Sequence, residues 1–169
     1  MKNLILVRHA KSSWSKTDLS DFERPLNERG NRDKITMGAR LEKRNESIEK
    51  VISSSAKRTT QTSIALVKAI NYPISDIQFE DTIYHSSVTI MMQFINDVDN
   101  SIDTMMLVAH NPGISMLCDY LCGDFFEFPT LGMVKITFDT QDWQEIFRDT
   151  GSLEWVDYPK MSIKIQTNI

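Results

Sequence analysis

Short apolar runs alternate along the chain with longer amphipathic segments. The runs are too short for ordinary helices and are bounded by polar or turn-forming residues, so they predict strands at 3–7, 50–53, 77–79, 104–109 and 133–138. Apolar residues at three- and four-residue spacing predict helices at 31–44, 57–70, 87–97 and 112–121. A further strand is expected in LEWVDYP after Gly151 and Ser152, and the tail MSIKIQTNI fits an edge strand or a frayed end.

The order of these elements defines the expected fold class. Strands that alternate with helices predict an α/β layer fold with a mostly parallel sheet. At 169 residues the chain is long enough for one domain with its own core, and it contains no repeat, low-complexity tract or linker. We therefore expect a single domain spanning residues 1–169.

Composition and charge narrow the function classes. A hydrophobic content of 41% with 25% charged residues is ordinary for a globular protein and argues against disorder or a membrane protein. The net charge of -4 argues against a nucleic-acid partner. No apolar run approaches a membrane span and no signal peptide is recognisable, so we expect a cytoplasmic protein without membrane partners.

The two cysteines and the other ligand-forming residues do not suggest a metal site. Cys118 and Cys122 lie four apart in a predicted helix, which favours buried free thiols over a disulfide or a metal pair. No His and carboxylate set has a recognisable ligand spacing. We therefore expect neither a metal nor another cofactor.

Three predicted strands end in cationic or imidazole side chains. The strand LILV is followed by Arg8 and His9, KVISSS leads to Arg58, and TMMLVAHNPG ends in His110 and Asn111. In open α/β sheets, ligands bind at the carboxyl ends of the strands, beside helix N-termini. Each motif alone is weak evidence, but three at one edge predict an anion site. Phosphate fits best, because a planar guanidinium binds two oxygens at once.

The motifs LVRHAK, SSSAKRTTQT and VAHNPG, in this order and each after a strand, resemble those of the histidine phosphatase superfamily. The stretch DFERPLNERG and the short chain are similar to the SixA-type phosphohistidine phosphatases. The resemblance implies a phosphoglycerate-mutase-like fold, which is a three-layer α/β/α sandwich. Two positions depart from the usual pattern: Ala10 replaces a glycine and Ser55 replaces a proline, and neither carries a reacting group.

The resemblance also implies residue roles. His9 would be the nucleophile and would carry a phosphohistidine intermediate. Arg8, Arg58 and His110 would surround the transferring phosphoryl group and stabilise its charge, without a metal. Asn111 would add hydrogen bonds to the same oxygens, and Arg24 in DFERPLNERG would be a further phosphate ligand or simply a solvated loop residue.

The general acid is the missing part of the pattern. Related enzymes carry a carboxylic acid where this chain has His85, with Glu80 and Asp81 as other candidates nearby; His85 could equally be a surface residue. A phosphomonoester needs a proton on its departing alkoxide, whereas an imidazole leaving group, with a conjugate acid of pKa ~6.5, is easily protonated by solvent. The weak acid signal therefore favours a phosphohistidine substrate.

Three functions remain open. The first is a phosphohistidine phosphatase acting on a phosphorylated protein such as a histidine phosphotransfer domain, since a short chain leaves little room for a lid and predicts a shallow, open pocket. The second is a small-molecule phosphomonoesterase, favoured if one of the candidate acids points into the pocket. The third is a non-catalytic phosphoprotein-binding module, against which the complete set of reacting groups argues.

Overall fold

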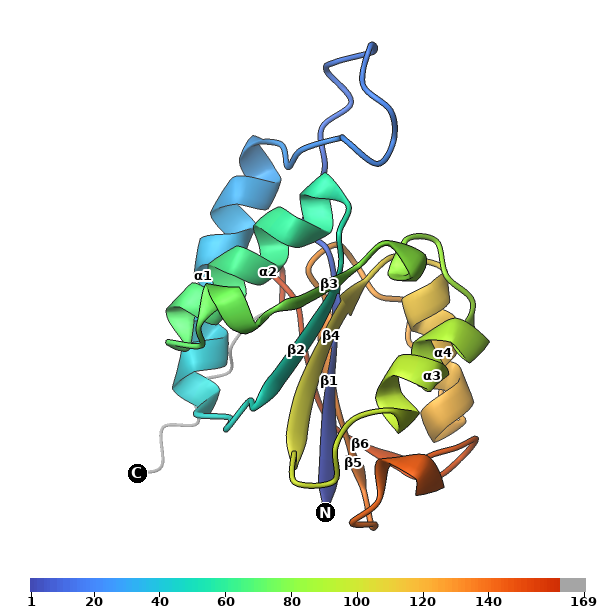
Figure 1. Cartoon of the computed structure of the whole chain (residues 1–169). Coiled ribbons are helices and arrows are strands. Elements are labelled where there is room, and N and C mark those ends of the chain that lie inside the picture. The colour runs from blue at the N-terminus through green and yellow to red at the C-terminus, as the bar shows by residue number, and fades with distance from the viewer. Residues whose placement is uncertain (162–169) are drawn as a thin grey trace.

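The computed structural model describes residues 1–161 and contains one six-stranded sheet with four longer helices (Figure 1). The strands lie in the order β3-β2-β4-β1-β5-β6. Their bounds are β1 Lys2–Arg8, β2 Lys50–Ser54, β3 Gln78–Glu80, β4 Thr104–Ala109, β5 Met133–Phe138 and β6 Gly151–Asp157. The helices are α1 Glu28–Arg44, α2 Lys57–Ala69, α3 Val88–Asn96 and α4 Gly113–Cys122. The predicted α/β class is confirmed; the tail, expected as an edge strand or a frayed end, lies outside the described residues from 162 onward.

The sheet is mostly parallel, as predicted. β1, β4, β2 and β3 pair in parallel, β5 runs antiparallel to β1, and β6 runs antiparallel to β5. Strands β1 to β4 are joined in chain order through helices α1, α2 and α3, each of which returns the chain to the starting edge. All these strands except β5 therefore point their carboxyl ends to the same edge.

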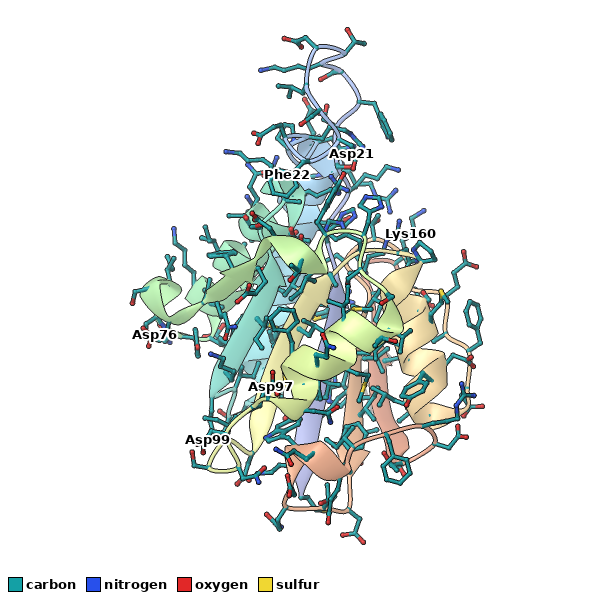
Figure 2. All side chains as sticks on the ribbon, turned by 45° about the vertical axis from the view of Figure 1, so that its right-hand side comes forward. Asp21, Phe22, Asp76, Asp97, Asp99 and Lys160 are labelled. Atoms are coloured by element: carbon teal, nitrogen blue, oxygen red, sulfur yellow. The ribbon has the colours of Figure 1, made fainter. Side chains whose placement is uncertain are left out.

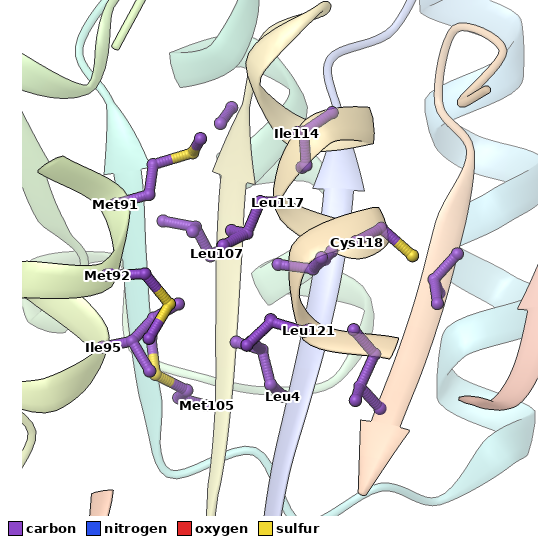
Figure 3. Packing of buried hydrophobic residues seen from close by; sticks show 14 of the residues in the cluster. Leu4, Met91, Met92, Ile95, Met105, Leu107, Ile114, Leu117, Cys118 and Leu121 are labelled. Carbon is purple, nitrogen blue, oxygen red and sulfur yellow. The ribbon is translucent and has the colours of Figure 1, made fainter. Parts of the chain in front are cut away.

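Both faces of the sheet are covered by helices, which makes a three-layer α/β/α sandwich. Side chains alternate along a strand, so Ile5 and Val7 of β1 pack under α1 and α2, whereas Leu4 and Leu6 pack under α3 and α4. Figure 3 shows the second cluster, in which Leu4 and Leu107 meet the inner faces of α3 and α4. Burial on both faces explains why the central strands read as continuous apolar runs.

Two details of the chain differ from the sequence pattern. Helix α1 begins at Glu28 rather than at residue 31, because the Asn27 side chain accepts a hydrogen bond from the Gly30 N–H and caps the helix three residues earlier. Three short 3₁₀ helices were not predicted, since one turn has no periodicity to detect; they are Ile74–Asp76, Asp81–Ile83 and Trp143–Glu145.

Gly30 gives a test of how the first turn of α1 packs against the segment that follows His9. A Cβ at position 30 would lie 2.2 Å from the backbone oxygen of Lys11, whereas a Cβ at Gly38 of the same helix would lie 3.1 Å from the Ala69 methyl and 3.7 Å from the Ala65 backbone oxygen. Alanine favours a helix by about 1 kcal/mol over glycine, but forcing backbone apart costs about 1–3 kcal/mol. We predict that Gly30→Ala lowers the free energy of unfolding more than Gly38→Ala does, measured by urea denaturation. A Gly30→Ala protein as stable as the Gly38→Ala control would contradict the close approach.

Candidate active site

Three strand ends bring His9, Arg58 and His110 together at the carboxyl edge of the sheet. His9 follows β1, His110 follows β4, and Arg58 lies in the first turn of α2 after β2. The two imidazole rings are 5.2 Å apart between centroids, and Arg58 Nε lies 3.3 Å from His9 Nε2. All three residues are at least nine-tenths buried. The structure therefore forms the cluster that the sequence predicts.

The surroundings of His9 fix its protonation. Its Nδ1 lies 2.7 Å from the Ala10 carbonyl oxygen, which can only accept a hydrogen bond, so Nδ1 carries the proton and Nε2 keeps its lone pair. Burial lowers the pKa of His9 to about 3, and the neighbouring cations Arg58, Arg8 and Arg24 add to this effect. The hydrogen bond to the Ala10 carbonyl raises the pKa but is outweighed. The imidazole is thus neutral near pH 7, with an unprotonated nitrogen facing Arg58.

His110 is held from the end of β2. Its Nε2 lies 2.8 Å from Ser54 Oγ, and that oxygen accepts a hydrogen bond from the Ala56 N–H. The hydroxyl can donate its proton to Nε2. In that tautomer the ring proton lies on Nδ1, a buried atom with no hydrogen-bond partner among the described residues. Burial and the nearby His9 and Arg58 lower the pKa of His110 well below its usual range.

Arg8 and Asn111 meet at one backbone oxygen. Arg8 Nη1 donates to the Phe128 carbonyl at 2.7 Å, and Asn111 Nδ2 donates to the same oxygen at 3.1 Å. The Asn111 side-chain oxygen accepts from Ser115, so its amide holds the 128 segment in place. Arg8 Nε is buried and has no partner within residues 1–161. An unpaired buried donor of this kind is costly unless a ligand supplies an acceptor.

Asp21 is a residue of this site that the sequence analysis did not identify. It lies in the connection between β1 and α1, and its carboxylate accepts hydrogen bonds from Arg58 Nη2 at 3.0 Å, Arg24 Nη1 at 2.7 Å and the Tyr84 hydroxyl. Partial burial would raise the pKa of this carboxyl, but the hydrogen bonds from Tyr84, Arg24 and Arg58 outweigh it and hold the pKa well below its usual range. The sequence feature that could have identified Asp21 is its position three residues before Arg24, at the start of DFERPLNERG.

Arg24 is buried but fully engaged inside its own loop. Its Nε donates to the Ser13 carbonyl, Nη2 donates to Ser12 Oγ, and Nη1 binds Asp21. The indole of Trp14 covers the guanidinium, 3.2 Å from ring centroid to Cζ. The structure thus places Arg24 next to the site through Asp21, with each of its three nitrogens bonded to a protein oxygen.

The three candidate acids occupy different places. The His85 ring stacks on His110 with centroids 5.6 Å apart, and its Nε2 lies 3.3 Å from Asp21 Oδ2, so it borders the site. The Glu80 carboxylate accepts a hydrogen bond from the Gln78 side chain, and the Asp81 carboxylate accepts one from Ser55 Oγ. Tyr84, also missed from the sequence, packs edge-on against His110. Of the three candidates, His85 has direct contacts with this cluster.

The described part of the chain offers few other features for ligands. Within residues 1–161, no three His, Cys, Asp or Glu side chains are grouped as a metal ion would require. Over the same residues, no helix has the length and apolar character to cross a membrane. Cys118 and Cys122 are both free, as the sequence predicts; Cys118 is buried, whereas Cys122 is only half-buried. A hollow of about 310 Å³ adjoins His110 and His85 and extends to Met116.

Comparison with known proteins agrees with this geometry. The family model of the histidine phosphatase superfamily (branch 1) matches residues 4–81, which include Arg8, His9 and Arg58. A solved structure from Agrobacterium tumefaciens, named as a candidate phosphohistidine phosphatase SixA, is 25% identical with a TM-score of 0.79, over 94% of this chain and 98% of that one. The first half of the chain is thus similar to the histidine phosphatase superfamily, and its fold is that of the SixA neighbour.

Other similar proteins carry different names. The structure of the protein histidine phosphatase SixA complexed with tungstate has a TM-score of 0.80 at 22% identity, covering 93% of this chain and 97% of that one, which confirms the phosphoglycerate-mutase-like fold. A mycobacterial glucosyl-3-phosphoglycerate phosphatase matches with a TM-score of 0.65 at 13% identity, covering 91% and 97%. An uncharacterized chloroplastic protein of Arabidopsis thaliana is 26% identical, over 91% of this chain and 74% of its own.

The buried neutral His9 gives a test by pH. Its folded pKa is about 3, whereas an unfolded imidazole titrates near ~6.5. Between these values only the unfolded chain binds the proton, so the native state loses stability as pH falls below about 6.5, by up to about 1.4 kcal/mol per pH unit. We predict that the wild type loses about 2 kcal/mol more than His9→Gln between pH 7 and pH 5, in urea unfolding. Equal losses would show that His9 titrates normally in the folded protein.

Proposed function

We propose that this protein is a member of the histidine phosphatase superfamily and acts as a phosphohistidine phosphatase, which removes the phosphoryl group from a histidine of a phosphorylated protein. The observation that carries the proposal is the neutral His9, whose unprotonated Nε2 faces Arg58 while Nδ1 is held by the Ala10 carbonyl. A mere phosphate-binding module needs the cations but has no use for a nucleophile prepared in this way.

In the proposed reaction, His9 Nε2 attacks phosphorus and forms a P–N bond while the bond from phosphorus to the substrate imidazole breaks. The departing nitrogen takes its proton from solvent. Water then attacks the phosphohistidine, releases inorganic phosphate and restores His9. Arg8 Nε and His110 Nδ1, both buried and unpaired among the described residues, would donate to the phosphoryl oxygens. Arg58 would stabilise the equatorial charge, so no metal is needed.

The environment of the candidate acids supports the choice of substrate. Asp21 is the carboxylate nearest to Arg58, but its lowered pKa keeps it ionised and unable to deliver a proton near pH 7. Glu80 and Asp81 bind other side chains instead. A site without a carboxylic acid suits a leaving group that is readily protonated, and a phosphohistidine provides one.

The alternative is a small-molecule phosphomonoesterase, and one observation favours it. His85 stacks on His110 at the edge of the cluster, where a protonated imidazole could serve as the acid. The mycobacterial neighbour is named for a sugar phosphate derivative. The two readings differ in how strongly the rate depends on the leaving group.

A side-by-side assay separates these functions. We predict that the purified protein hydrolyses a phosphohistidine protein at least about 100-fold faster, in kcat/KM, than a phosphoserine peptide, because a missing general acid costs 10²–10⁴-fold when an alkoxide must leave. His9→Ala should lack activity on both substrates, and EDTA should not change either rate. Comparable rates on the two substrates would favour the phosphomonoesterase and its His85 acid. Activity in His9→Ala would refute the nucleophile.

A further inference from the structure

We propose that Asp21 is an internal competitor for the phosphoryl group: its carboxylate binds Arg58 and has to release it when substrate binds. This inference rests on the proposed anion site and adds a residue that sets its affinity. Asp21 lies at the foot of the loop that projects beyond the sheet, next to Phe22 (Figure 2).

The hydrogen bonds of Arg58 are the first observation. Its Nε faces His9 Nε2, its Nη1 donates to the Asp21 backbone carbonyl at 2.6 Å, and its Nη2 donates to Asp21 Oδ2 at 3.0 Å. Every nitrogen of the guanidinium therefore has a protein partner, and two of the three partners belong to Asp21. A phosphoryl group that binds the fork through two oxygens would need the same two nitrogens.

The second observation is the position of the carboxylate. Its Oδ1 binds Arg24 while its Oδ2 binds Arg58, so it bridges two guanidinium groups as a phosphate oxygen pair would. Tyr84 and His85 also approach Oδ2. The Asp21 side chain is 40% exposed, whereas the Arg58 side chain behind it is 5% exposed. Asp21 thus stands between solvent and the cation that the substrate must reach.

Competition follows from charge. Asp21 is an anion at working pH and repels a phosphoryl dianion that enters the same pocket. When the phosphoryl group displaces it, Arg58 exchanges one anionic partner for another, so the net gain on binding is smaller than for a free arginine. The same exchange in reverse helps inorganic phosphate to leave after hydrolysis. Asp21 accordingly sets the phosphate affinity of the site through Arg58.

The test is binding of orthophosphate, which requires no turnover and so does not depend on the substrate assignment. We predict that Asp21→Asn binds orthophosphate at least about fivefold more tightly than the wild type by isothermal titration calorimetry, since the amide is neutral. Asp18→Asn is the matched control: it removes the same charge from an exposed position of the same loop and should change the affinity less than about twofold.

Tyr84→Phe provides a second variant. It removes the hydroxyl that holds Asp21 at Oδ2, so it should also tighten orthophosphate binding, by less than Asp21→Asn. Affinity that is unchanged or weaker in Asp21→Asn would overturn the proposal and would mean that Asp21 only orients Arg58. Absence of orthophosphate binding in both the wild type and Asp21→Asn would overturn it as well. Tighter binding without phosphohistidine hydrolysis would support Asp21 while refuting the proposed enzyme function.

Discussion

Charge balance in one small buried pocket governs how the rest of the site is built. Parallel strands bring Arg8, His9 and the Arg58 helix to the same edge, so positive charge collects where water is largely excluded. Such a cluster is unfavourable unless each cation has an acceptor and each imidazole stays neutral. The Phe128 carbonyl serves Arg8, Asp21 serves Arg58, and burial keeps both histidines unprotonated. The pocket is thereby left ready for an anion.

A small set of hydroxyl groups holds this pocket together. Thr62 Oγ1 accepts from the Ala10 N–H and donates to the Arg58 carbonyl, which ties the segment after His9 to the start of α2. Ser63 binds Ser53, and Ser54 binds His110. Buried hydroxyls of α2 and of the end of β2 thus connect the three strand ends, and each is satisfied by a specific partner, as buried polar groups must be. The alignment of His9 with Arg58 depends on these contacts.

The sequence predicted the periodic parts of the structure well. Strand and helix positions agree within a few residues, since burial on two faces and amphipathic helices leave clear patterns, and the three cationic strand ends follow from the topology. The connection before α1 has no such pattern. Asp21 and Tyr84 were missed because a charged loop residue and an aromatic residue in a turn are usually solvated or structural. Arg24 and Asn111 were found as polar candidates, but their partners were not. The Asp21 carboxylate is a near neighbour of Arg24 within one irregular loop, and the Phe128 carbonyl lies 17 residues after Asn111, so neither contact leaves a periodic pattern in the sequence.

The central claim is that His9 Nε2 becomes covalently phosphorylated during turnover. The most direct measurement is rapid acid-free quenching of the enzyme with a phosphohistidine protein, followed by mass spectrometry of the peptides and ³¹P NMR. The account predicts one phosphoryl group on the peptide that contains His9, in the isomer substituted at Nε2, stable in base and lost in acid. A phosphoryl group on His85 or His110, or turnover with no phosphorylated enzyme at any time point, would contradict it.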